Sequence, residues 1–156
     1  MKLLSPAFKH LSSIPEKYTC EGANVNPPLE WLDLPPKTVS LVLIMDDPDV
    51  PAFVRKDQMY VHWVIYNIPP TASRIQEHST PPGIQGRGTG GVMHYDGPCP
   101  PDREHRYFFK LYTLDELLSL PPGASKKEVE NGMKGHVIAQ TELIGLYCKK
   151  HLRNQI

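Results

Sequence analysis

Short apolar runs, separated by pairs of prolines, make up most of the chain. Three of these runs are rich in β-branched and aromatic residues and predict strands: Val39–Met45, Tyr60–Ile68 and Arg106–Thr113. Weaker signals of the same kind occur at Lys2–Leu4 and Leu29–Trp31. Runs this short, each ending at turn residues, indicate sheets rather than long helices.

Proline is the outlier in the composition, with 17 of 156 residues against a usual share of about 5%. Most of the prolines stand in pairs between the apolar runs: Pro27-Pro28, Pro35-Pro36, Pro69-Pro70, Pro81-Pro82, Pro100-Pro101 and Pro121-Pro122. Proline has no amide hydrogen to donate to a neighbouring strand, so the pairs predict fixed turns between strands.

One helix is predicted late in the chain. Ser125 and Glu128 form the pattern of a capping box, and Val129 and Met133 give an apolar stripe at helical spacing. The final segment, His136–Tyr147, fits a helix as well, but every second residue from Val137 to Leu143 also forms an alternating set, and Gly145 suits a strand end, so we predict a strand. Because helices do not separate successive strands, we expect a mainly β fold, an antiparallel sandwich with few helices, in a single domain spanning residues 1–156.

Charge and cysteine content exclude several classes of protein. Lys plus Arg equals Asp plus Glu, at 17 each, which argues against a broad nucleic-acid surface. No apolar stretch is long enough for a membrane-spanning helix. The three cysteines, Cys20, Cys99 and Cys148, are far apart and form no CxxC pair. We therefore expect reduced thiols and a cytoplasmic protein.

Two polar clusters adjoin the strongest strands. Asp46–Pro51 follows the first strand, where prolines would hold the carboxylates in place, although a plain polar turn explains the same residues. His62 stands in an otherwise apolar strand, as a satisfied core residue or as a ligand-binding group. The loop Tyr95–Glu104 combines glycine with prolines, favours an anion cradle of backbone amides, and leads into His105 and Tyr107 on one strand face.

Two other signals are set aside. Gly86–Gly91 contains the spacing GxGxxG, but no helix pattern follows it, so a dinucleotide site is not predicted. Asp47, Asp49, His62 and His105 could bind a metal chemically, but their spacing does not require one. We predict neither a metal nor a cofactor.

The two clusters resemble motifs of the phosphatidylethanolamine-binding protein family, also called Raf-kinase-inhibitor-protein-like, and most of all its bacterial and archaeal branch. The resemblance covers nearly the whole chain. Its central motifs are Asp47-Pro48-Asp49-Val50-Pro51, His62-Trp63, Asn67-Ile68-Pro69, Tyr95-Asp96-Gly97-Pro98-Cys99-Pro100-Pro101 and His105-Arg106-Tyr107-Phe108-Phe109.

This resemblance implies a Greek-key β-sandwich with a small pocket for phosphate-like groups at one end. Carried over by residue, the ligand-binding residues would be Asp47, Asp49, His62, Gly97, His105 and Tyr107. Family members are associated with phospholipid head groups and with modulation of kinases or proteases through protein contacts. The resemblance implies no shared enzymatic activity.

Three functional hypotheses follow. The leading one is a protein, monomeric or homodimeric, that binds a phosphate-like anion or a phospholipid head group, with protein partners in addition. The alternative is a hydrolase acting on a phosphate-containing substrate through His62 and Asp47. The third is a protein-interaction module with a vestigial pocket. Turnover of a phosphate-containing substrate would separate the second hypothesis from the first.

The pattern also makes geometric predictions. The Val50–Pro51 bond, in the Asp-Pro-Asp loop, is the best candidate for a cis peptide, which would mark a specially shaped turn. His62, His105 and Tyr107 should converge on one cavity, with Asp47 or Asp49 hydrogen-bonded to His62. Such a carboxylate would raise the pKa of His62, so sulfate binding should weaken as the pH rises.

Overall fold

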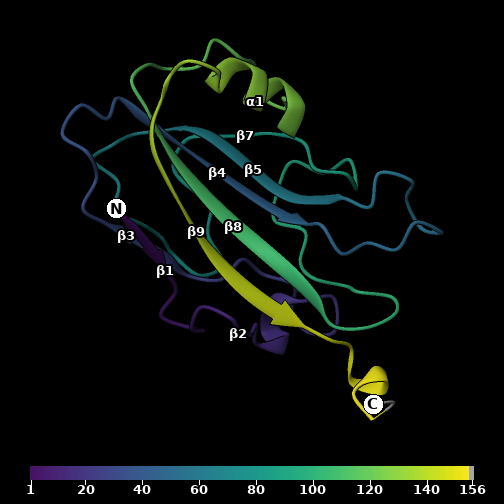
Figure 1. The fold of residues 1–156 in the computed structure, drawn as a ribbon. Helices are drawn as coiled ribbons and strands as arrows, with labels where there is room; N and C mark the ends of the chain where they lie inside the picture. Colours follow the sequence, from purple (N-terminus) through teal and green to yellow (C-terminus); the bar gives the residue numbers. More distant parts are fainter. Residues whose placement is uncertain (155–156) are drawn as a thin grey trace.

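Two sheets and one α-helix make up the part of the chain that the structure, a computed structural model, describes: residues 1–154 (Figure 1). The larger sheet runs in the order β2 (Ser12–Ser13), β9 (Val137–Tyr147), β8 (His105–Leu114), β4 (Ser40–Asp47), β5 (Tyr60–Ile68) and β7 (Ile84–Gln85). The smaller sheet contains β1 (Lys2–Leu4), β3 (Leu29–Leu32) and β6 (Arg74–Ile75). The helix α1 spans Lys126–Met133, and two short 3-10 turns span Glu16–Tyr18 and Lys150–Leu152.

The mainly β prediction is confirmed, and strands β1 and β5 have the predicted bounds. All strand pairs are antiparallel except β2 with β9, which are parallel. Strand β4 differs from the prediction, because it continues through Asp46 and Asp47 instead of stopping before them. Asp46 pairs with Val61 and Phe108, so its backbone keeps the sheet ladder on both sides.

The main core lies between the two sheets. Leu3, Trp31 and Ile75 of the small sheet belong to the same buried cluster as Leu43 and Phe109 of the large one. Alternate residues of β4 point to the other face, where they meet the buried side of α1. Because both faces of β4 are covered, the strand is apolar at nearly every position rather than alternating.

Helix α1 covers one end of the larger sheet (Figure 1). Its predicted start is confirmed: the Ser125 hydroxyl accepts from the Glu128 amide, and the Glu128 carboxylate accepts from the Ser125 amide, each at 3.1 Å. Val129 and Met133 are buried against the sheet. Within residues 1–154, none of the helices has the length and apolar character needed to cross a membrane.

The expectation of reduced thiols is wrong for two of the three cysteines. Cys20 and Cys99 form a disulfide across 79 positions of sequence, and Cys148 is a free thiol. The fold brings the two segments together, since the Cys20 amide donates to the Pro98 carbonyl at 3.1 Å. Disulfides are rare in the cytosol, so the cytoplasmic prediction loses the support it drew from the cysteines.

The predicted cis peptide at Val50–Pro51 is also wrong, because residues 1–154 contain no cis bond. The turn closes by other means. The Asp49 amide donates to the Asp47 carboxylate at 2.7 Å. The amides of Val54 and Arg55 both donate to the Pro51 carbonyl, at 2.9 and 3.2 Å. These bonds make a tight turn with trans prolines.

Candidate functional site

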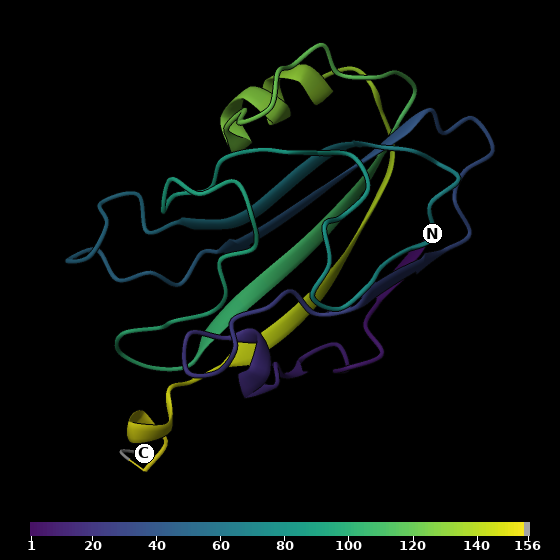
Figure 2. The same cartoon turned by 180° about the vertical axis from the view of Figure 1, so that it is seen from behind.

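A cavity of about 310 Å³ lies where β4 ends and where β5 and β8 begin. The loops that follow β4 and precede β8 lie at this same end of the molecule (Figures 1 and 2). Twelve residues line the cavity: Asp47, Val50, Val54, Tyr60, His62, Asp96, Gly97, Cys99, Pro100, Pro101, His105 and Tyr107. Five of the six predicted site residues are among them, and Asp49 is not.

Asp49 instead forms an ion pair beside the cavity. Its two carboxylate oxygens accept from the Arg106 guanidinium at 2.8 and 2.9 Å, and one also accepts from the Arg106 amide at 2.9 Å. These hydrogen bonds lower the pKa of Asp49. Asp49 therefore connects the turn after β4 to the start of β8 and does not reach into the cavity.

His105 is buried between two carboxylates. Its Nδ1 lies 2.6 Å from Asp47 Oδ2, and its Nε2 lies 2.7 Å from Asp102 Oδ1. Burial by itself would lower the pKa of His105, but the hydrogen bonds to Asp47 and Asp102 outweigh it and the pKa is raised. The ring is therefore an imidazolium that donates from both nitrogens, which leaves it no nitrogen for a ligand.

His62 has no carboxylate partner, so the prediction that Asp47 or Asp49 holds it is wrong. Its Nδ1 lies 2.5 Å from the backbone carbonyl of Asp96. The two oxygens of Asp47 are taken by His105 and by the Asp49 amide. Burial lowers the pKa of His62, only partly offset by the Asp96 carbonyl and nearby carboxylates. The predicted rise in pKa is therefore also wrong.

The protonation state of His62 decides what it offers a ligand. A neutral ring whose Nδ1–H donates to a carbonyl carries a lone pair on Nε2. Within residues 1–154 no group forms a hydrogen bond with this second nitrogen of His62. His62 thus accepts from a ligand when neutral and donates to one when protonated.

The Tyr107 hydroxyl is the least satisfied group of the cavity. It is fully buried and has no hydrogen-bond partner within residues 1–154. The Tyr107 ring meets the His62 ring edge-on, with centroids 5.3 Å apart. Burial, and then the charge of Asp47, raises the pKa of Tyr107, so the hydroxyl keeps its proton. A buried hydroxyl without a partner costs about 1–3 kcal/mol, which a ligand acceptor would recover.

Gly97 lines the cavity for a different reason from the one predicted. Its amide donates to Asn24 Oδ1 at 2.9 Å and is therefore unavailable to an anion. A Cβ at this position would lie 2.3 Å from Asn24 Oδ1 and from the Tyr18 carbonyl. Glycine is needed here so that the segments around residues 18–24 and 95–99 can pack closely.

Sequence reasoning missed the partners that orient the predicted residues. The Asp96 carbonyl holds His62, and the Asp96 carboxylate accepts from Tyr60 Oη at 2.9 Å. Asp102 holds His105 from three positions upstream, a spacing that a turn before a strand could have suggested. No sequence signal identified the Asp96 carbonyl, because every residue has a backbone carbonyl and the residue type does not show which one will accept a hydrogen bond.

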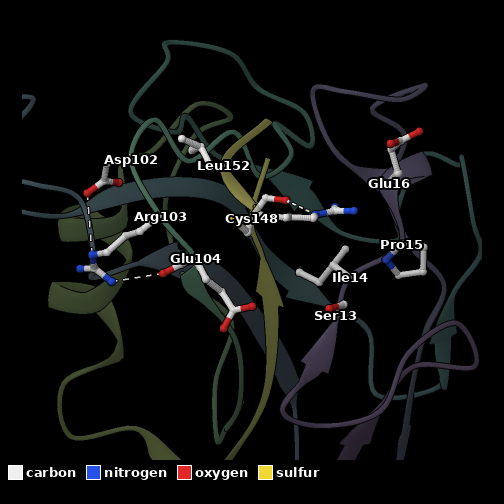
Figure 3. A pocket seen from close by; sticks show the side chains of 10 residues that line it. Ser13, Ile14, Pro15, Glu16, Asp102, Arg103, Glu104, Cys148 and Leu152 are labelled. Atoms are coloured by element: carbon white, nitrogen blue, oxygen red, sulfur yellow. Dashed lines mark hydrogen bonds and ion pairs between the residues drawn. The ribbon is translucent and has the colours of Figure 1, made fainter. Parts of the chain in front are cut away.

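A larger cavity of about 630 Å³ adjoins the Asp102 side of this site (Figure 3). Both of its arginines are engaged within its lining: Arg103 donates to the Glu104 carbonyl at 3.1 Å and lies 3.7 Å from Asp102, and Arg153 donates to the Cys148 carbonyl at 3.0 Å. Within residues 1–154, the buried side-chain atoms without a partner are Tyr107 Oη and Asp46 Oδ1, and neither residue lines this larger cavity. The smaller cavity is therefore the better candidate site.

The cavity does not form a metal centre by its side-chain geometry. No group of three or more His, Cys, Asp or Glu side chains is arranged to hold a metal in the part of the chain that is described. His105 has both nitrogens in hydrogen bonds to carboxylates, and Asp49 is paired with Arg106. Of the four residues that the sequence brought forward as conceivable ligands, Asp47 and His105 bond to each other, and Asp49 and His62 bond to other groups.

Comparison with known proteins identifies the family. Residues 4–148 match the family model described as phosphatidylethanolamine-binding protein. The chain belongs to this family. It is 44% identical to a UPF0098 protein of Chlamydia pneumoniae, covering 96% of this chain and 99% of that one. It is 46% identical to a UPF0098 protein of Methanothermobacter thermautotrophicus, covering 94% and 98%.

Solved structures of the phosphatidylethanolamine-binding protein family share the fold. The putative family homolog CT736 from Chlamydia trachomatis matches with a TM-score of 0.92 at 45% identity, over 94% of this chain and 96% of that one. E. coli YbcL, described as a member of the mammalian family, matches with a TM-score of 0.85 at 27% identity, over 96% and 98%. The predicted family and the mainly β fold are both confirmed.

Proposed function

We propose that this protein binds a phosphate-type anion, such as a phospholipid head group, in the cavity between β4, β5 and β8. The observation that carries the proposal is the fully buried Tyr107 hydroxyl, which has no protein partner and belongs to a residue that lines the cavity with its ring against His62. A tyrosine hydroxyl that keeps its proton is a hydrogen-bond donor, and a charged oxygen is its strongest acceptor.

The charges around the cavity set the condition for an anion to enter. The His105 imidazolium is shared between Asp47 and Asp102, and Asp102 also lies 3.7 Å from Arg103, so Asp47 is only partly compensated. The Asp96 carboxylate also lines the cavity and bonds to the neutral Tyr60 hydroxyl, so a positive charge on His62 favours an anion there. His62 supplies the second contact. An anion without a proton of its own, such as sulfate or a phosphodiester, binds better when His62 is protonated. A phosphomonoester that keeps one proton can instead donate to neutral His62.

The hydrolase hypothesis loses its geometric basis. It required Asp47 to orient His62 as a general base, but Asp47 bonds to His105. His105 could not replace His62 as the base, because both of its nitrogens already bond to carboxylates. The proposed activity is therefore binding without turnover.

The proposal is tested by calorimetric titration of phenyl phosphate and of sulfate into the wild type and the Tyr107→Phe variant. Loss of a hydrogen bond to a charged group should weaken binding by roughly tenfold to a hundredfold. The variant should unfold at the same or a higher urea concentration, because its buried hydroxyl had no partner. Tyr112→Phe, on the same strand but outside the cavity, is the matched control. Equal affinity of Tyr107→Phe and wild type would refute the proposal.

A further inference from the structure

The β4–β5 loop, residues 48–59, carries an exposed apolar tip at the mouth of the cavity. Phe53 is 82% exposed, the highest value among the large apolar side chains of residues 1–154. Its neighbour Val54 is 50% exposed and also lines the cavity, as does Val50. The exposed apolar surface is therefore continuous with the cavity wall, unlike the isolated apolar residues common on protein surfaces.

The loop is ordered, so Phe53 is held outward by a defined turn. The Val54 and Arg55 amides donate to the Pro51 carbonyl. The Arg55 guanidinium donates to the Met59 carbonyl at 3.0 Å and to Asp57 at 3.2 Å, which orders the arm of the loop that follows Phe53. The hydrogen bonds fix the backbone on either side of Phe53 and leave its ring in solvent.

One free cation lies on this loop and a second cation lies at its base. Lys56 is exposed and makes no ion pair within residues 1–154. The Arg103 side chain is 59% exposed, donates to the Asp49 carbonyl at 3.3 Å and lies 3.7 Å from Asp102. The two carboxylates of the β4–β5 loop are paired with arginines, Asp57 with Arg55 and Asp49 with Arg106, so Lys56 is the unpaired charge of this loop in the part of the chain that is described. Figures 1 and 2 show the β4–β5 loop projecting past the ends of the strands, at the same end of the molecule as the loop that precedes β8.

A protruding apolar tip with cations beside it fits the interface of an anionic lipid bilayer. Aromatic side chains enter the boundary between head groups and acyl chains, and nearby Lys and Arg add attraction to anionic lipids. A stable protein interface needs a broader complementary surface than a single turn presents. We propose that Phe53 inserts into such a bilayer, so that the cavity takes its head group at the membrane surface. This inference rests on the proposed function.

The test is co-sedimentation with vesicles of equal parts phosphatidylcholine, phosphatidylethanolamine and phosphatidylglycerol. Phe53→Ser should lower vesicle binding by roughly tenfold to a hundredfold, the value of burying one phenylalanine. Leu117→Ser is the matched control: Leu117 is 59% exposed but lies near the opposite end of β4, where the Ser40 hydroxyl donates to the Glu116 carbonyl. It should leave vesicle binding unchanged.

Two further variants test the geometry and the charge. Phe53→Trp should give a blue shift of tryptophan fluorescence when vesicles are added, above the response of the wild type with its buried Trp31 and Trp63. Lys56→Gln should weaken binding to the anionic vesicles by about fivefold. It should not change binding to vesicles of phosphatidylcholine alone.

Phenyl phosphate titration separates the two proposals, because that ligand reaches the cavity without a membrane. Phe53→Ser should bind phenyl phosphate like the wild type. If phenyl phosphate fails to bind the wild type, the proposed function fails. Phenyl phosphate can bind the wild type while the wild type fails to sediment with vesicles, or while Phe53→Ser sediments equally well. Either result overturns membrane docking alone, and a protein partner would then be the remaining candidate for binding at Phe53.

Discussion

The pKa values of the two cavity histidines shift in opposite directions although both side chains are buried. His105 lies between two carboxylates, which raise its pKa, whereas His62 lies against a backbone carbonyl, and burial lowers its pKa. A carbonyl dipole satisfies one N–H but does not compensate a full charge in a buried site, and a carboxylate does both. The partner, rather than the burial, decides the protonation state.

This difference assigns separate roles to the two walls of the cavity. On the β8 wall, His105 uses both nitrogens inside the protein, so it fixes the structure and compensates Asp47. On the β5 wall, His62 uses one nitrogen for the Asp96 carbonyl and keeps the other for the cavity. Mutations should therefore affect stability mainly at His105 and ligand binding mainly at His62.

The largest expected effect is on the β8 wall. His105→Gln removes the imidazolium and leaves the Asp47 carboxylate, whose side chain is 4% exposed, without a counter-charge. Breaking one partner of a buried pair costs about 3–5 kcal/mol, measured by urea unfolding at pH 7. The control His62→Gln loses one neutral hydrogen bond and should cost about 1 kcal/mol.

A double variant checks the cause of that loss. Adding Asp47→Asn to His105→Gln removes the unpaired charge and should restore part of the stability. Equal losses of unfolding free energy in His105→Gln and His62→Gln would contradict the separation of roles between the two walls.

The next effect concerns the disulfide, which should support the His62 wall selectively. Cys20–Cys99 closes a loop across 79 positions and joins the segment that carries Asp96. Replacing both cysteines with serine should cost about 2–4 kcal/mol in unfolding free energy. In NMR spectra the ring signals of His62 should shift, and those of His105 should stay in place. A shift confined to the ring signals of His105 would mean that the disulfide supports the His105 wall instead of the His62 wall.

The smallest effect is the direction of titration. NMR should show His62 losing its proton below pH 6.5 and His105 above it. The lowered pKa of His62 gives stability that is present above pH 6.5 and is lost as the pH falls through the folded-state value. The raised pKa of His105 gives stability that is present below pH 6.5 and is lost as the pH rises through its folded-state value.

Sulfate binding follows the same proton on His62. Sulfate stays charged, so it favours protonated His62, and its affinity should rise by up to about tenfold per pH unit as the pH falls toward the pKa of His62. In His62→Ala this dependence should disappear while Tyr107 still contributes. If the sulfate affinity of His62→Ala kept the pH dependence of the wild type, the titrating group would be a residue other than His62.

Local patterns were enough for the elements and for most of the residues near the cavity. The capping box at Ser125, the apolar strand Tyr60–Ile68 and the alternation before Tyr147 are each defined within a few residues, where side-chain period and backbone preference act. The family motifs added five of the residues that line the cavity. Asp49 lies outside that lining because Arg106, on another strand, turns it away.

The sequence by itself therefore determined a β-rich chain with a late helix and the set of polar residues gathered at one end. Only the tertiary structure decided which of them meet: Asp47 with His105 across 58 positions, His62 with the Asp96 carbonyl across 34, and Cys20 with Cys99 across 79. The physical reason is that these contacts join residues far apart in sequence, so they depend on the register of the strands and on which loops the fold brings together. A hydrogen bond over a few ångströms then decides which histidine is charged.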